Sequence, residues 1–264
     1  MSFDMGFYLI DHRLLAMGMV AVLVVIVELV YRAGTRWKDA PDSLRSQVSG
    51  IGAAMLGILG VLLGFTLSMA IARWDVRRDV IVEESNAIGT LWLRAGLLED
   101  PLRDELRSAL QEYTDTRIAL GGSRGDLDAL RAAQSEGAAL HAKIWSVVER
   151  ADQPGTSPAI LSTLIAAAND LIDLHELRVA SIENFLPAFL ILLLPCITAA
   201  AVASLAWSFG ATSERGRTPI LLLTLLICAV ILLIMDVNRP QRGAIGVGVA
   251  TLERVQESIA PAKS

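Results

Sequence analysis

Long apolar runs dominate the pattern of hydrophobic and polar positions along the chain. They cover Leu14–Tyr31, Ile51–Ala72, Phe185–Trp207 and Pro219–Met235. Each run holds about 17 to 23 residues, and a helix that rises about 1.5 Å per residue then crosses a hydrocarbon layer of about 30 Å. A helix of a soluble protein needs only one apolar face, whereas these runs are apolar on all sides. The pattern predicts an integral membrane protein with four transmembrane helices.

The runs form two hairpins on either side of a charged segment. This predicts an all-α membrane protein in which a soluble helical bundle is inserted between spans two and three. The expected parts are an N-terminal membrane hairpin (1–72), a soluble helical domain (73–184), a C-terminal membrane hairpin (185–237) and a C-terminal tail (238–264). Residues 1–10 hold no Lys or Arg, so the first run is expected to stay in the membrane rather than act as a cleaved signal peptide.

Local signals divide the charged segment into helices. No helix breaker follows Ala72, so the second span is expected to continue to about Leu98. Asp100-Pro101 predicts the start of the next helix, Gly121-Gly122 its end, and Ser157-Pro158 a further start. The remaining expected helices are 126–150, 159–184 and a short one near 250–259. We find no convincing alternation of strand type in this segment, so a helical bundle is the simplest assembly.

Two stripes run along the second span. Small residues recur every three or four positions at Ala53, Gly57, Gly60, Gly64 and Ser68. Bulky apolar residues form a second stripe at Ile58, Leu62, Phe65 and Met69. Small stripes let another helix approach closely. Both stripes could serve packing alone, or one could line a pathway in an oligomer, and the sequence leaves both interpretations open.

Charge narrows the choice of partners. The net charge is −5, and residues 73–184 hold 19 acidic and 12 basic side chains, which argues against nucleic acid as a partner. Asn169, Asp173 and Glu176 share one helical face that could hold a divalent ion. Because Arg178 is near enough to compete for these carboxylates, a solvated or ion-paired face is the simpler interpretation, and we expect no metal site.

Catalytic signatures are missing from the sequence. The three histidines, His12, His141 and His175, are scattered, and Cys196 and Cys228 both lie within apolar runs. Nucleophilic catalysis needs a Ser or Cys near an oriented base, and no H-E-x-x-H or C-x-x-C pattern occurs. We therefore expect neither an enzyme nor a bound cofactor.

The side of the membrane on which the soluble domain lies does not follow from charge alone. An even number of spans places both termini and the soluble domain on one side, but Lys and Arg are almost evenly divided between the two sides. Glu28 and Arg32 lie one helical turn apart near the end of the first span and are expected to pair.

Several motifs, in order, resemble a bacterial bestrophin-like membrane family that is described as a domain of unknown function. They are LGFTLSMA (63–70), ARWDVRR (72–78), ESNAIGT (84–90), NDLIDLHELR (169–178), LP (186–187) and DVNRPQRG (236–243). The motif residues that we single out are Arg73, Trp74, Asp75, Glu84, Asn86, Asp173, His175, Arg178, Asp236, Arg239, Pro240, Arg242 and Gly243. The resemblance covers residues 50–260.

More distantly, the second span is similar to that of true bestrophins, which are pentameric anion channels with a hydrophobic neck and a cytosolic helical domain. The resemblance implies a homo-oligomer in the inner cell membrane, with the soluble domain and termini in the cytoplasm. It also implies a pore for small inorganic ions, lined by the second span and narrowed at the bulky stripe. Where true bestrophins carry a polar Arg-Thr-Asn run, this chain has Met69-Ala-Ile.

Three hypotheses therefore remain from the sequence. The first is an oligomeric anion channel. The second is a non-conducting scaffold or sensor whose helical domain binds a partner, because no charged residue lies deep in the spans. The third is a stator-like, ion-driven unit, which shares the pattern of four spans with a domain between the second and third.

Overall fold

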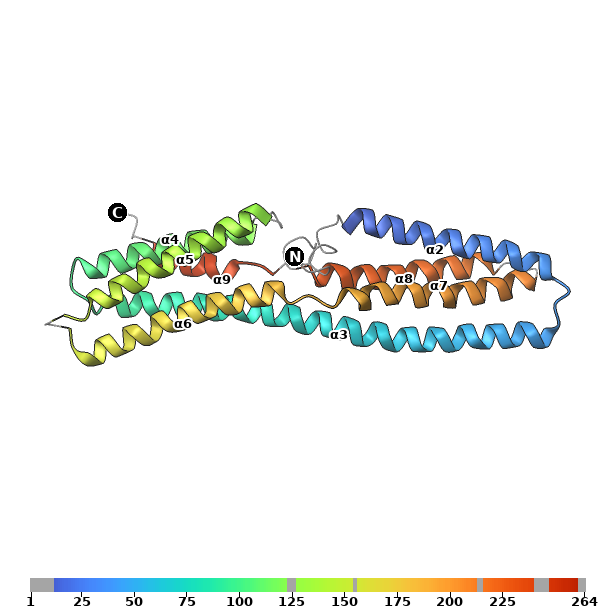
Figure 1. Cartoon of the computed structure of the whole chain (residues 1–264), viewed down its shortest axis with the longest axis horizontal. Coiled ribbons are helices and arrows are strands. Elements are labelled where there is room, and N and C mark those ends of the chain that lie inside the picture. The colour runs from blue at the N-terminus through green and yellow to red at the C-terminus, as the bar shows by residue number, and fades with distance from the viewer. Residues whose placement is uncertain (1–11, 123–126, 154–155, 213–215, 240–246, 261–264) are drawn as a thin grey trace. The chain divides into compact units, whose positions relative to one another are not determined.

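The computed structural model of the chain describes residues 12–122, 127–153, 156–212, 216–239 and 247–260. The regular elements in these ranges are helices (Figure 1). In chain order they are α2 (His12–Gly34), the 3-10 helix η1 (Thr35–Trp37), α3 (Asp42–Ala95), α4 (Leu102–Gly122), α5 (Leu127–Arg150), α6 (Pro158–Glu183), α7 (Ala188–Ala211), α8 (Arg217–Val237) and α9 (Ala250–Ile259). Among these described helices, α2, α3, α7 and α8 are long and apolar enough to cross a membrane. The prediction of an all-α chain with four such helices is confirmed.

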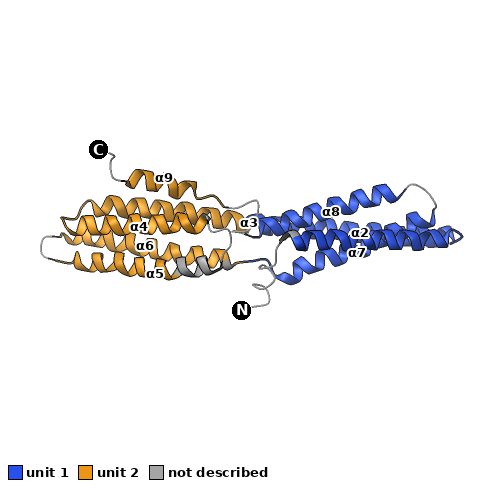
Figure 2. Ribbon diagram, turned by 90° about the horizontal axis from the view of Figure 1, so that it is seen from above, with its two compact units in different colours: residues 1–72, 185–239 blue, residues 73–184, 240–264 orange. Residues whose placement is uncertain are grey.

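The chain divides into two compact units (Figure 2). Unit 1 comprises residues 1–72 and 185–239, and unit 2 comprises residues 73–184 and 240–264. Helix α3 is a single helix of 54 residues that contributes to both units. No Gly or Pro occurs between Ala70 and Val80, so the sequence contains no residue that would break the helix where one unit ends and the other begins.

In unit 1, α2 packs against α7 and α8, and α7 packs against α8. Two glycines set the approach of α2 to α7. A Cβ added to Gly34 would lie 2.4 Å from the carbonyl oxygen of Trp207, and one added to Gly210 would lie 2.3 Å from that of Tyr31. The two backbones can therefore approach this closely only because neither position carries a side chain.

Glu28 of α2 is paired as predicted and has a second partner. Its carboxylate oxygens lie 2.6 Å from Nε of Arg32 and 2.8 Å from an Nη of Arg217, the first residue of α8. The second pair joins two helices that are far apart in the sequence, which is why sequence spacing did not predict it.

Unit 2 is built around one hydrophobic cluster, to which five helices contribute residues. Residues of α3, α4, α5, α6 and α9 contribute to it, including Ile88, Leu91, Leu106, Leu110, Ile144, Leu164, Leu171 and Leu252. Helix α4 packs against both α5 and α9, and α5 packs against α6. On α4, the buried residues Leu106, Leu110 and Tyr113 are spaced by three or four positions, which places them on one face of the helix.

The boundaries of the helices follow local signals, with small departures. The Ser157 side chain caps α6 by accepting a hydrogen bond of 3.2 Å from the Ile160 N–H, as the Ser-Pro pair predicts. Helix α3 ends at Ala95, three residues before the predicted position, because the next N–H groups turn back to bond the carbonyls of residues 93–95. Helix α4 begins at Leu102, directly after Pro101.

Candidate functional site

The apolar part of α3 uses one face to pack within its own chain. The buried residues on that face are Gly52, Leu59, Leu63, Thr66 and Ala70. Successive residues of a helix are rotated by about 100°, so these positions fall within a narrow sector. This face is distinct from both stripes that the sequence singled out.

The small stripe is uncovered in the single chain. Ala53, Gly57, Gly60, Gly64 and Ser68 are all exposed. A Cβ added to any of the three glycines would meet no other atom within 4 Å. The stripe is therefore not used for packing inside the chain and is free to receive another helix.

The bulky stripe is also largely uncovered. Ile58, Phe65 and Met69 are exposed, with Phe65 at 67%, while Leu62 is half-buried. Large apolar side chains that the chain's own residues leave uncovered are available to lipid or to an assembly of several copies. The single chain thus has three faces on one helix, of which only one is occupied by its own residues.

In unit 2, the motif residue Glu84 lies at a buried polar centre. Its Oε1 accepts hydrogen bonds of 2.6 Å from the hydroxyl of Tyr113 and 2.9 Å from Nε of Arg117. Its Oε2 accepts a hydrogen bond from Nη1 of Arg178, the last residue of a motif on α6. All four side chains are buried. The carboxylate of Glu84 on α3 therefore links α4 and α6 through hydrogen bonds that are shielded from solvent.

Charge partners decide the ionisation of this centre. Burial alone would raise the pKa of Glu84, but Arg178 and Arg117 outweigh it, so the pKa is lowered. Burial and the neighbouring carboxylate raise the pKa of Tyr113 well above its ordinary value. At neutral pH the centre therefore holds a carboxylate, two guanidinium groups and a neutral phenol.

Two histidines adjoin the polar centre, which corrects the expectation that the histidines are scattered. The rings of His141 and His175 lie edge to face with their centroids 4.5 Å apart, and both side chains are buried. Burial, then Arg117, lowers the pKa of both, and that of His175 falls to about 4. Because α5 and α6 each contribute one histidine, this proximity arises only when the helices pack.

Sequence reasoning missed Arg117, Tyr113 and His141, because none of them belongs to a recognised motif. A signal was nevertheless present. Tyr113 and Arg117 continue the buried stripe that begins with Leu106 and Leu110 on α4. A charged residue in the apolar stripe of an amphipathic helix implies a buried partner of opposite charge.

Arginines of the second motif bind the end of α6. Arg77 donates from Nε to the carbonyl of Ser181 at 2.9 Å and from Nη2 to the carbonyl of Asn184 at 2.8 Å. Arg73 donates from Nε to the side-chain oxygen of Asn184 at 3.3 Å. Cationic donors at the C-terminal end of a helix satisfy carbonyls that have no partner inside it, which accounts for these residues structurally.

The other motif residues lie in varied settings. Asp75, Asn86 and Asp173 are exposed, whereas Trp74 and Asp236 are half-buried. Arg239 is buried, and its neighbour Asn238 accepts a hydrogen bond of 3.1 Å from the N–H of Leu186, within the Leu-Pro motif. Pro240, Arg242 and Gly243 lie outside the described residues.

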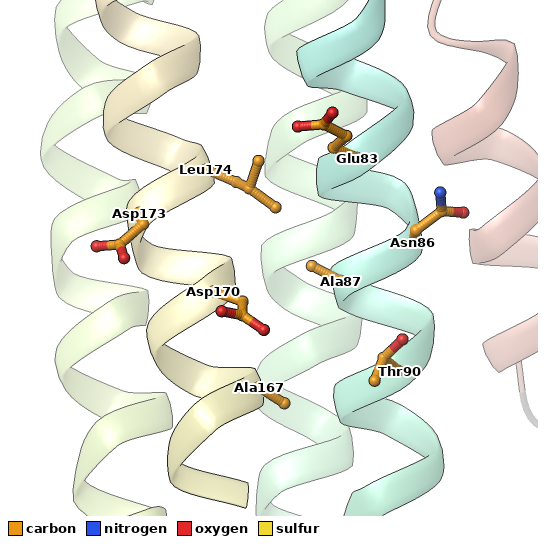
Figure 3. A pocket seen from close by; sticks show the side chains of 8 residues that line it. All are labelled: Glu83, Asn86, Ala87, Thr90, Ala167, Asp170, Asp173 and Leu174. Carbon is orange, nitrogen blue, oxygen red and sulfur yellow. The ribbon is translucent and has the colours of Figure 1, made fainter. Parts of the chain in front are cut away.

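An open acidic pocket of about 420 Å³ lies between α3 and α6 (Figure 3). It is lined by Glu83, Asn86, Ala87, Thr90, Ala167, Asp170, Asp173 and Leu174. Among the described residues, no group of three or more His, Cys, Asp or Glu side chains is placed to hold a metal ion. Asn169, Asp173 and Glu176 are exposed, and Arg178 pairs with Glu84 rather than with this face, which corrects the expected competition.

Residues 15–252 match the family model of the Bestrophin-like domain. The chain belongs to the bestrophin-like family. Together with the four long apolar helices, membership makes this bestrophin-like protein a membrane protein. No curated protein matches the chain.

Solved structures share the fold of this bestrophin-like protein. Two crystal structures of point variants of a bacterial bestrophin homologue from Klebsiella pneumoniae match with TM-scores of 0.73 and 0.67 at 12% identity. Each match covers 92% of this chain and 97% of the other. A variant described as a membrane protein matches with a TM-score of 0.70 at 13% identity, covering 92% and 96% of the two chains. At this level of identity, the likeness shows the fold.

Proposed function

We propose that this bestrophin-like protein is an oligomeric channel for small anions, with a pore lined by α3. The observation that carries the proposal is the division of α3 into three faces. At about 100° per residue, the buried face, the small stripe and the bulky stripe are separated by about 100° to 130°. One face packs within the chain, the small stripe receives a neighbouring copy, and the bulky stripe faces the lumen.

The bulky stripe suits a hydrophobic gate. Apolar constrictions control conduction by losing or admitting water, without a charged residue in the pore. The segment from Ile51 to Ala72 contains no charged side chain, so the stripe itself does not select by charge. The preference for anions rests on the family resemblance.

Liposome flux tests the pore directly. Chloride and sodium flux would be measured for wild type and for Phe65→Ala, which shortens an exposed side chain of the bulky stripe. Phe189→Ala is the matched control, because Phe189 lies on the membrane helix α7 and is 65% exposed, against 67% for Phe65. We expect chloride flux that rises at least several-fold in Phe65→Ala and is unchanged in Phe189→Ala. Equal fluxes in all three proteins would refute a pore lined by α3.

We further propose that the protein lies in the inner membrane with unit 2 and both termini in the cytoplasm. The support is the similarity to true bestrophins, since the charges flanking the spans do not decide. A cysteine placed at Lys143, which is exposed on α5, would react with a membrane-impermeant thiol reagent only after cells are opened. Labelling in intact cells would contradict this orientation and place unit 2 outside the cytoplasm.

A scaffold or sensor is the second candidate, and the open acidic pocket favours it. Carboxylates of Asp170 and Asp173 are exposed on α6 and available to a basic partner. A protein that is folded but silent in liposomes, and whose partner capture is lost in Asp170→Asn, would support this function over the channel. A stator-like unit needs a titratable group in its spans, and Glu28, at the end of α2, is already held by Arg32 and Arg217.

A further inference from the structure

The polar centre around Glu84 contains hydrogen-bond groups that have no partner. Arg117 donates to Glu84 through Nε, but its Nη1 and Nη2 are buried without a hydrogen bond to any described residue. The same holds for Nδ1 of His175 and Nε2 of His141. Leaving a buried polar group unsatisfied destabilises the folded state, and more so when the group is charged. Four such atoms in one cluster are a set of hydrogen-bond groups that could hold a buried ligand.

Two of the unpaired atoms, on His175 and Arg117, lie close to Gly137 of α5. A point at the Cβ position of that glycine lies 3.5 Å from Nδ1 of His175 and 3.6 Å from Nη1 of Arg117. The two atoms are therefore close enough to each other for one small ligand to contact both. The ring of His141 lies against that of His175, with 4.5 Å between centroids. An alanine at this position would place its Cβ 2.9 Å from Cε1 of His175, so the His175 ring would have to shift.

Among the described residues, the charges in the centre do not balance. Glu84 supplies one negative charge, while Arg117 and Arg178 each supply a positive one. Both histidines are neutral at pH 7, since burial and Arg117 lower their pKa values. An uncompensated buried charge is costly, whereas a water molecule would satisfy donors without balancing it.

We propose that this centre binds one small monovalent anion, of the size of chloride or bromide, between Arg117, His175 and His141. Arg117 donates to it through its Nη groups, and each imidazole can donate through its unpaired ring nitrogen. The site lies within unit 2 and does not depend on conduction through the spans. Binding would stabilise the packing of α4, α5 and α6.

Bromide serves as the probe, with the full chain purified in detergent. Thermal unfolding would be compared in sodium bromide and sodium gluconate at equal ionic strength. We expect bromide to raise the unfolding temperature in a saturable manner, because a ligand that binds only the folded state stabilises it. Gly137→Ala should lose this shift. Gly89→Ala should retain it, since Gly89 also lies within a helix but a Cβ there meets nothing within 4 Å.

Anomalous diffraction from bromide-soaked crystals of the wild type gives an answer that does not depend on any variant folding. The expected result is an anomalous peak within hydrogen-bond distance of Arg117 and His175. A normal water peak without anomalous signal at that position would overturn the proposal. An equal bromide shift in Gly137→Ala and Gly89→Ala would also overturn it.

Discussion

At the scale of single residues, the most consequential feature is the enclosure of Glu84. The carboxylate has no contact with solvent, and Tyr113, Arg117 and Arg178 supply its hydrogen bonds. A buried ion pair adds little to stability compared with apolar residues of the same volume. Removing one partner is costly, however, because it leaves the other charge unpaired in an interior of low dielectric constant. Substitutions here should therefore be far more harmful than at the neighbouring carboxylate.

We expect Glu84→Gln to lower the free energy of unfolding by about 3–5 kcal/mol, because two buried guanidinium groups would lose their counter-charge. Glu83→Gln is the matched control, since Glu83 is the adjacent residue but is exposed. Its expected effect is within about 0.5 kcal/mol. Thermal unfolding of the full chain in detergent measures both. Similar losses in the two variants would contradict the assigned role of Glu84.

Acid should destabilise the protein between about pH 6.5 and 4. The pKa of His175 falls from 6.5 to about 4 in the folded state, so in this window the unfolded chain binds more protons than the folded one. The contribution of His175 to the free energy of unfolding is then fully present above pH 6.5. It is lost as the pH falls, by at most about 1.4 kcal/mol per pH unit for one histidine. The lowered pKa of Glu84 acts in the same direction at more acidic pH.

Thermal unfolding between pH 8 and 4.5 would measure this dependence. His175→Phe keeps a ring at the position but removes the titrating group, so its unfolding temperature should fall less steeply with acid than that of the wild type. Identical slopes for the two proteins would show that His175 does not cause the acid sensitivity.

At the scale of elements, local sequence signals predicted the helices well, but they did not predict the contacts between helices. The glycine pair at 121–122 and Ser157 mark ends that the structure places within a residue or two. The motif residues Glu84 and Arg178 form a pair that the sequence did not predict, and Arg117 lies 33 residues from the same carboxylate. Periodicity shows which face of a helix is buried, whereas it does not show which residue of another helix packs against it.

The glycine contact between α2 and α7 gives a prediction at this scale. Gly34→Ala would force a Cβ to within 2.4 Å of a backbone oxygen on α7, so the helices must separate. We expect a loss of about 1–3 kcal/mol in the free energy of unfolding. Gly18→Ala, also on α2, should be neutral or slightly stabilising because a Cβ there meets nothing within 4 Å. Unfolding in detergent compares the two, and equal stabilities would show that the contact is not tight.

At the scale of the whole molecule, the proposed oligomer depends on the small stripe. Gly60→Leu would place a bulky side chain on that stripe without touching the chain's own packing. We expect it to lower the oligomer mass measured by light scattering in detergent while leaving helix content unchanged. Gly18→Leu adds the same side chain to an open position on α2 and should preserve the wild-type mass. A smaller assembly in both variants, or in neither, would exclude this stripe as the specific interface.

Each unit combines segments that are far apart in the sequence, so some of its contacts can form only late in synthesis on the ribosome. Glu84 is made 94 residues before Arg178, which at about 5–20 residues per second is a delay of roughly 5 to 20 s. During that interval the carboxylate can be stabilised only by water and by the partners on α4. Helix α2 likewise enters the bilayer before α7 and α8 exist. A chain cut after residue 184 would contain every hydrogen-bond partner of Glu84 but would leave the first hairpin without α7 and α8.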